Sequence, residues 1–124
     1  MIDHITVRVR NIEATLKFYS SALKPLGYTI GYDKTFEDAR VVGLKRANTI
    51  DTWFITDSPP SGPLHIAWSA DTRTAVDAFY SAAIAAGGKD NGKPGPRPHY
   101  GSSYYGAFVI DPDGNNIEAV CHEV

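Results

Sequence analysis

Apolar and polar residues alternate from position 2 to position 9, which predicts a β-strand with one packed face and one polar face. A helix is expected next, with Asn11 as its cap and an apolar stripe at Ile12, Leu16, Tyr19 and Leu23. β-Branched and aromatic residues then predict three strands, over 28–32, 40–44 and 52–56. The first half of the chain therefore predicts the order strand, helix, strand, strand, strand.

A proline-rich linker at 58–62 separates this half from a second one, in which the pattern restarts. A strand is predicted over 64–70, followed by a helix with an apolar stripe at Val76, Phe79, Tyr80, Ala83 and Ile84. The chain ends in a predicted hairpin, whose strands 108–110 and 116–121 flank the turn Asp111-Pro112-Asp113-Gly114. The Gly- and Pro-rich stretch 92–106 is predicted as a long loop.

The restart is an internal repeat. An offset of 61 residues aligns positions 4–27 with 65–88 without a gap and gives eight identical residues over 24 positions. We therefore expect one α+β domain, 1–124, built from two βαβββ units at about 1–57 and 63–124. The curled mixed sheets of the two units are expected to pair into a cup or incomplete barrel with the helices outside, because neither sheet closes alone.

The repeat places one histidine at the same point of each unit, His4 and His65, on the strand face opposite the helix. Glu118 lies on the corresponding face of the last strand, where a carboxylate needs water or a partner. Two imidazoles and one carboxylate are ligands typical of a divalent Fe, Mn, Ni or Zn site. In the alternative interpretation the histidines are structural and Glu118 faces solvent.

The predicted loop carries further candidates: Arg97 as an anion clamp, His99, Tyr104 and Tyr105 as catalytic groups, and Tyr100 as a substrate contact. Only one of Tyr104 and Tyr105 is expected to face the cup, because adjacent strand residues point to opposite sides. Trp53 and Phe54 are also candidate substrate contacts, expected to line a pocket, with core filling as the alternative. The alternative is that the loop residues only pack on the rim.

Composition excludes several classes of function. The net charge is −2 with 21% charged residues, which predicts neither a nucleic-acid surface nor a membrane-binding patch. The single cysteine, Cys121, excludes an internal disulfide and a Cys-based zinc site, and fits a reducing compartment. No signal peptide or membrane-length apolar run is recognised, so a cytoplasmic protein is expected.

The sequence resembles the vicinal oxygen chelate superfamily, which contains glyoxalase I, bleomycin and fosfomycin resistance proteins and extradiol dioxygenases. The resembling segments span the chain: Asp3-His4-Ile5-Thr6-Val7, Phe18-Tyr19, Leu64-His65-Ile66-Ala67, and Asp111 to Glu118. The resemblance implies a metal in the cup between two units of one chain or of two chains, a homodimer, and ligands at His4, His65 and Glu118. In glyoxalase I-like members the resemblance also implies a fourth ligand, on the last strand of the first unit. In this chain Phe54 aligns with Glu118 and so takes that position, unless the register slips by one residue.

Two functions follow from the resemblance. The first is a small metal enzyme, a lyase, isomerase or dioxygenase, that chelates a small organic substrate through vicinal oxygens. The second is a binding protein of the bleomycin-resistance type that sequesters a small molecule without turnover. A metal-free structural dimer is the third interpretation left open by the sequence.

Overall fold

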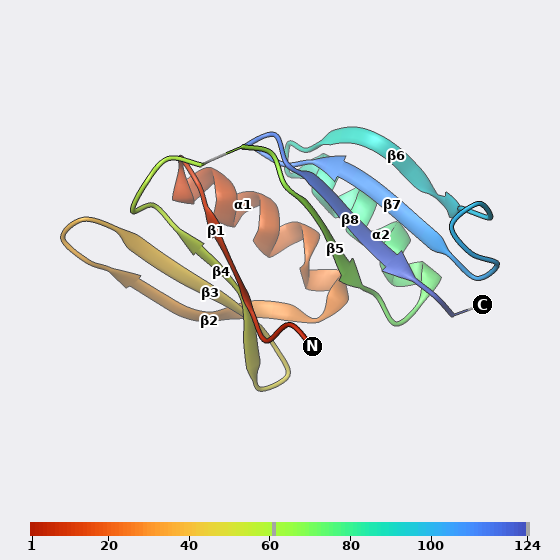
Figure 1. The fold of residues 1–124 in the computed structure, drawn as a ribbon, viewed down its shortest axis with the longest axis horizontal. Coiled ribbons are helices and arrows are strands. Elements are labelled where there is room, and N and C mark those ends of the chain that lie inside the picture. Colours follow the sequence, from red (N-terminus) through yellow and green to blue (C-terminus); the bar gives the residue numbers. More distant parts are fainter. Residues whose placement is uncertain (61, 124) are drawn as a thin grey trace.

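The computed structural model describes residues 1–60 and 62–123; Ser61, within the predicted linker, and Val124 lie outside the described residues. It contains two helices, a short 3₁₀ turn and two four-stranded sheets (Figure 1). The first unit comprises β1 (Ile5–Arg8), α1 (Ile12–Ala22), η1 (Lys24–Leu26), β2 (Tyr28–Thr35), β3 (Arg40–Arg46) and β4 (Thr49–Ile55). The second comprises β5 (His65–Ser69), α2 (Arg73–Ala85), β6 (Lys89–Pro96), β7 (Tyr105–Ile110) and β8 (Asn116–Cys121).

Both sheets have the same topology. The strand order is β1-β4-β3-β2 in the first sheet and β5-β8-β7-β6 in the second, with one parallel pair at the inner end of each, β1 with β4 and β5 with β8. The remaining neighbours are antiparallel. Two mixed sheets that do not close into a barrel confirm the predicted α+β class and its repeated βαβββ order.

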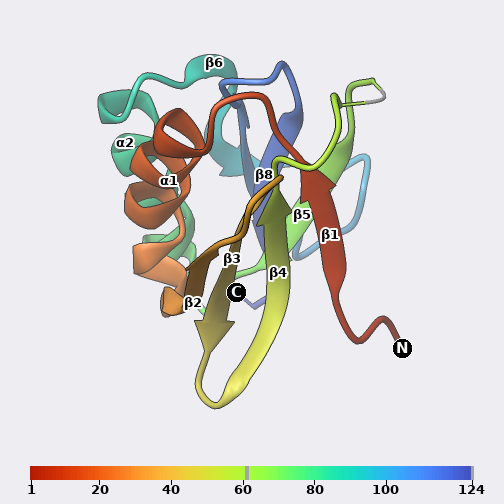
Figure 2. The same ribbon diagram turned by 90° about the vertical axis from the view of Figure 1, so that its left-hand side faces the viewer.

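The helices cover one side of both sheets and leave the other side open (Figure 2). We call this uncovered side the open face. β1 and β5 lie side by side where the two units meet (Figures 1 and 2). The core joins the units on the helix side, because the Tyr19 ring of α1 lies 4.6 Å from the Phe54 ring of β4 and 5.9 Å from the Trp68 ring of β5. None of the described helices is long and apolar enough to cross a membrane.

The prediction of an unbroken loop over 92–106 was wrong in its first part. β6 runs through Pro94 to Pro96 as the outer strand of its sheet. A proline has no N–H to donate to a ladder, but an edge strand has one side that needs no donor. Two register shifts, around Gly92, let this strand follow β7 despite its prolines.

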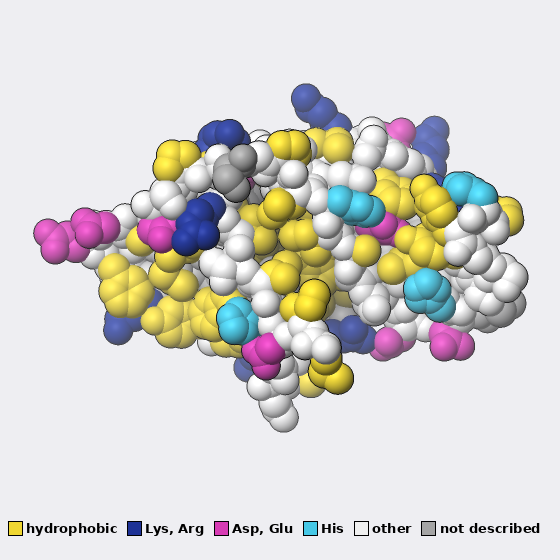
Figure 3. Space-filling view, in the orientation of Figure 1, with side chains coloured by type: hydrophobic (Ala, Val, Ile, Leu, Met, Phe, Trp, Pro, Cys, Tyr) yellow, Lys and Arg dark blue, Asp and Glu magenta, His cyan; other side chains and the backbone are white. Residues whose placement is uncertain are grey.

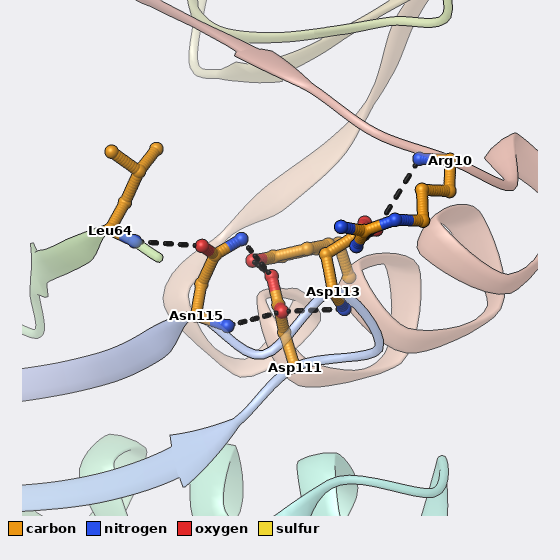
Figure 4. Close-up of polar contacts among 6 residues, drawn as sticks. Arg10, Leu64, Asp111, Asp113 and Asn115 are labelled. Atoms are coloured by element: carbon orange, nitrogen blue, oxygen red, sulfur yellow. Dashed lines mark hydrogen bonds and ion pairs between the residues drawn. The ribbon is translucent and has the colours of Figure 1, made fainter. Parts of the chain in front are cut away.

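The turn between β7 and β8 ties the two units together (Figure 4). Asp111 is buried and accepts four hydrogen bonds: from the amides of Asp113 and Asn115, from the Asn115 side chain, and from the Tyr19 hydroxyl of α1 at 2.5 Å. Burial, and then the neighbouring Asp111 carboxylate, raises the pKa of Tyr19 well above its usual value. Asn115 in turn accepts the amide of Leu64 at 2.8 Å. The turn therefore fixes the start of β5 immediately before His65.

Candidate functional site

Glu118 lies in the middle of β8, between Ala67 of β5 and Phe108 of β7. Ile117 and Ala119 turn to the helix-packed core, so the period-two alternation of the strand sends the Glu118 side chain to the open face. The residue is nevertheless only 1% exposed. A carboxylate buried to this extent is costly unless its oxygens are hydrogen-bonded, and its partners therefore define the site.

The first partner is His65, the first residue of β5. Its Nε2 lies 2.9 Å from Oε1 of Glu118, and with the carboxylate ionised His65 donates from this nitrogen. The imidazole is 54% exposed on its outer side. One edge of the ring thus meets a buried carboxylate while the rest faces solvent.

The second partner is Tyr104, just before β7, whose hydroxyl donates to Oε2 of Glu118. Gly106 makes room for this contact, because a Cβ at that position would lie 3.3 Å from Oε2 and 3.2 Å from the Tyr104 ring. Burial and then this hydrogen bond raise the pKa of Tyr104 to about 12. The hydroxyl therefore stays protonated at neutral pH and is a donor to the carboxylate.

Tyr105 does not share this site, which corrects its prediction as a catalytic residue. Its hydroxyl donates to Oδ1 of Asp77 on α2 at 2.7 Å, on the helix side of the sheet. The reason is strand alternation: Tyr105 pairs with Cys121, which is buried under α2, and Tyr104 therefore points the other way.

Arg97 and Phe108 extend the site towards the edge of the second sheet. Phe108 pairs with Glu118 and its ring centroid lies 6.1 Å from that of His65. The Arg97 guanidinium lies over the same ring, with its Cζ 5.5 Å from the centroid.

His99 and Tyr100 lie further out. The His99 ring centroid is 4.1 Å from that of Tyr100, and the Tyr100 ring is 5.2 Å from that of Tyr104. Both residues are exposed and neither is hydrogen-bonded to Glu118 in the described structure. His122 packs perpendicular to the Tyr104 ring at 5.2 Å. This aromatic row leads from the loop to the buried carboxylate.

His4 lies apart from the other two predicted ligands. It is exposed, precedes β1, and its Nδ1 contacts the Asp3 carboxylate at 2.6 Å. His4 and His65 both line a groove of about 390 Å³ where the units meet. Within 1–60 and 62–123, however, no group of three His, Cys, Asp or Glu side chains is placed to hold one metal ion. Figure 3 shows histidines spread over this face rather than gathered at one place.

The first unit presents an apolar surface where the second presents its carboxylate. Trp53 pairs with Thr6 in parallel, as Glu118 pairs with Ala67, so Trp53 is the repeat equivalent of Glu118. The alignment of Phe54 with Glu118 was therefore wrong by one residue. Phe54 is fully buried in the helix-side core, which also corrects its prediction as a substrate contact. Trp53 lines an open groove of about 460 Å³.

A divalent metal fits the second unit as a partial site. His65 Nε2 and Glu118 Oε1 are an imidazole nitrogen and a carboxylate oxygen 2.9 Å apart, close to the ~3 Å that separates neighbouring ligand atoms around an ion bound at about 2.1 Å. One described chain brings only these two of the three predicted ligands together. The donor chemistry fits a metal, and the donor number is incomplete.

Phe108 was not among the residues predicted for the site. The signal was available in the hairpin, because a turn over 111–115 pairs Ile110 with Asn116 and so places Phe108 opposite Glu118. The contact of Asn115 with Leu64 joins segments 51 residues apart and had no local signal.

Comparisons with known proteins agree with this architecture. The most similar solved structures include a glyoxalase/bleomycin resistance protein from Albidiferax ferrireducens T118, with 28% identity, 96% of each chain covered and a TM-score of 0.72. A glyoxalase/bleomycin resistance protein/dioxygenase family enzyme from Burkholderia phytofirmans PsJN has 21% identity, 97% of each chain covered and a TM-score of 0.69. A glyoxalase I mutant from Zea mays has 24% identity and a TM-score of 0.74, over 96% of this chain and 45% of the maize chain.

A comparison with curated protein sequences gave no match. The family model described as Glyoxalase/Bleomycin resistance protein/Dioxygenase superfamily matches residues 1–119, nearly the whole chain. The chain belongs to this superfamily.

Proposed function

We propose that the protein is a divalent-metal enzyme for a small organic substrate, and that its site is completed between two copies of the chain. In this proposal His65 and Glu118 of one copy and His4 of a second copy hold the metal. The observation that carries the proposal is the buried carboxylate of Glu118, which faces away from the core and contacts the exposed imidazole of His65. A carboxylate buried without a binding role would more simply be an apolar residue.

The requirement for a second copy rests on the position of His4. Its imidazole is exposed on the open face and shares no metal-sized cluster with His65 and Glu118 in the described chain. An isologous dimer that brings the open face of the first unit against that of the second would form two equivalent sites. It would also cover the apolar groove around Trp53.

A bound divalent metal would supply Lewis-acid chemistry, polarising two vicinal oxygens of the substrate. The chain's own residues then have separate tasks. Glu118 holds its position through Tyr104, whose hydroxyl occupies Oε2 and leaves Oε1 for the metal side. Because that hydroxyl stays protonated at neutral pH, Tyr104 holds a proton next to the reacting oxygens.

Elemental analysis of protein purified without chelator tests this proposal. We expect about one Fe, Mn, Ni or Zn per chain in the wild type, and its loss in Glu118→Ala and in His65→Ala. Tyr105→Phe, on the other side of the same sheet, is the matched control and should keep its metal. Wild-type protein that stays metal-free after addition of all four metals would contradict the proposal.

A binding protein without turnover is the second candidate, and the apolar groove around Trp53 favours it. In that case His65 and Glu118 would form hydrogen bonds with a ligand. Small molecules should then bind equally well to metal-free and metal-loaded protein, and Trp53→Ala should weaken binding more than His65→Ala does.

A further inference from the structure

The Arg97 side chain is held in a fixed position by its own loop. Its Nη1 donates to the carbonyl of Gly95 at 2.9 Å, and its Nη2 donates to the carbonyl of Lys93 at 2.7 Å. These two hydrogen bonds to backbone carbonyls set the direction of the guanidinium.

The neighbouring residues are shaped around this guanidinium. Gly92 has no side chain, and a Cβ there would lie 3.3 Å from Nη2 of Arg97 and 2.9 Å from the Phe108 ring. The guanidinium lies over that ring, which stabilises a cation by its negative face. Phe108 pairs with Glu118, and its ring lies 5.5 Å from the Arg97 guanidinium and 6.1 Å from the His65 imidazole, so both groups lie close to the same aromatic ring.

Among the residues that the structure describes, Arg97 has no acidic partner. None of the ion pairs among the described residues includes it. The carbonyls of Lys93, Gly95 and, at 3.5 Å, Pro96 engage its two Nη atoms, and no contact of the described residues uses Nε. A guanidinium has five N–H donors in a planar fork that matches a carboxylate or phosphate. A positioned cation with donors to spare is suited to bind an anion.

We infer that Arg97 binds an anionic group of the substrate, so that the substrate class is a small organic anion. Its flat or apolar part would lie across Phe108, and its reacting oxygens would extend towards His65 and Glu118. The placement of the reacting oxygens near His65 and Glu118 rests on the proposed function. The contact between Arg97 and the anion does not require a metal.

Arg73 offers a matched comparison on the opposite side of the sheet. Its guanidinium lies 4.9 Å from the centroid of the Tyr105 ring, but it belongs to α2 and its Nε donates to the Glu123 carbonyl. It is thus an arginine stacked on an aromatic ring, remote from Glu118. Replacing it controls for any general effect of removing a positive charge.

Titration of chelator-treated protein with benzoate, followed by ¹H–¹⁵N spectra of the arginine Nε and backbone groups, tests the inference. We expect benzoate to shift the Arg97 Nε signal and the Gly92 and Phe108 amides saturably, and neutral benzamide to leave them unchanged. Arg97→Gln should weaken benzoate binding at least about tenfold. Arg97→Lys should recover part of the affinity, and Arg73→Gln should bind like the wild type.

The inference is overturned if benzoate fails to bind the wild type saturably or if benzamide binds equally well. It is also overturned if Arg97→Gln and Arg73→Gln change the affinity for benzoate to the same extent. The direct shift of the Arg97 signal in the wild type keeps the test valid if a variant misfolds. Benzoate binding to Arg97 in a protein that takes up no metal would support this inference and reject the proposed metal enzyme. Metal uptake without benzoate binding would support the proposed metal enzyme and reject this inference.

Discussion

The two units share a fold and differ in what they present on the open face. At one repeat-equivalent position the second unit has Glu118 and the first has Trp53. The second unit adds Tyr104 and Arg97 around its carboxylate, whereas the first has an apolar groove with His4 at its rim. Duplication thus produced two similar frameworks, of which one carries the polar chemistry and the other a largely apolar wall.

The turns before the last strand differ as well. In the first unit β3 and β4 are joined by the two residues Ala47 and Asn48, and Ala47 has a positive φ of 55° as tight hairpins require. In the second unit the turn 111–115 is longer and contacts both units. The longer turn thus joins α1 of the first unit to the start of β5, the strand that carries His65.

The largest effect on stability is expected when the turn of the second unit is altered. Asp111→Ala would leave the Tyr19 hydroxyl and the turn amides without their acceptor, and should lower the free energy of unfolding by about 3 kcal/mol or more. Asn48→Ala, in the exposed turn of the first unit, should change it by less than about 0.5 kcal/mol. Urea unfolding measures both, and equal losses would show that the two turns do not differ in role.

The equivalent positions 118 and 53 should differ in metal affinity. Glu118→Ala removes a proposed ligand and should weaken metal binding at least about 100-fold. Trp53→Ala should leave it within about threefold, because an indole supplies no ligand for these metals. Calorimetric titration with Ni²⁺ or Zn²⁺ gives both values. A comparable loss in Trp53→Ala would mean that the first unit contributes more than a wall.

The titration of Tyr104 should report its contact with Glu118. Its phenol is expected to titrate at a pKa of about 12, and Glu118→Gln should lower that pKa only in part, because the charge of Glu118 is lost while burial, the larger cause of the raised pKa, remains. A tyrosine whose pKa is higher in the folded state holds its proton in the fold, so its contribution makes stability fall between about pH 10 and 12. NMR of ¹³C-labelled tyrosine resolves the residue. No change in the variant would show that the hydroxyl does not bind the carboxylate.

The smallest effects are expected at the ion pairs between the units. Asp113 is largely buried where it pairs with Arg10, and Asp113→Ala should cost about 1 kcal/mol. Asp71, which pairs with Arg46, is exposed, and Asp71→Ala should be close to neutral. Thermal unfolding of the two variants distinguishes them, because the Asp113 side chain is 6% exposed and also accepts the Arg10 amide, whereas the Asp71 side chain is 83% exposed.

Much of the fold followed from the repeat, because an offset of 61 aligns strand, helix and histidine in both units. The pairing of His65 with Glu118 also agrees with the predicted strand faces. The register of the last strands did not follow. Trp53 follows its partner Thr6 by 47 residues, whereas Glu118 follows its partner Ala67 by 51, so the offset of 61 does not align the last strands of the two units. β6 was missed because its prolines indicated a loop, although an edge strand tolerates them.

The separation of His4 from the other ligands lay beyond sequence reasoning for a different reason. Symmetry between repeats predicts that two histidines converge, but it does not distinguish two units of one chain from units of two chains. In the described chain His4 contacts Asp3 at the edge of the first unit. The location of the third ligand is thus a question about assembly.

Mixing two variants that each lack one proposed metal ligand tests the shared site most directly. His4→Ala and Glu118→Ala should each fail to retain metal as separate proteins. After they are unfolded together and refolded, each mixed dimer should contain one intact site, formed by His4 of one copy and His65 and Glu118 of the other, and elemental analysis should recover metal in that fraction. If the mixed dimers remain metal-free while refolded wild type binds metal, the site is not formed between two copies.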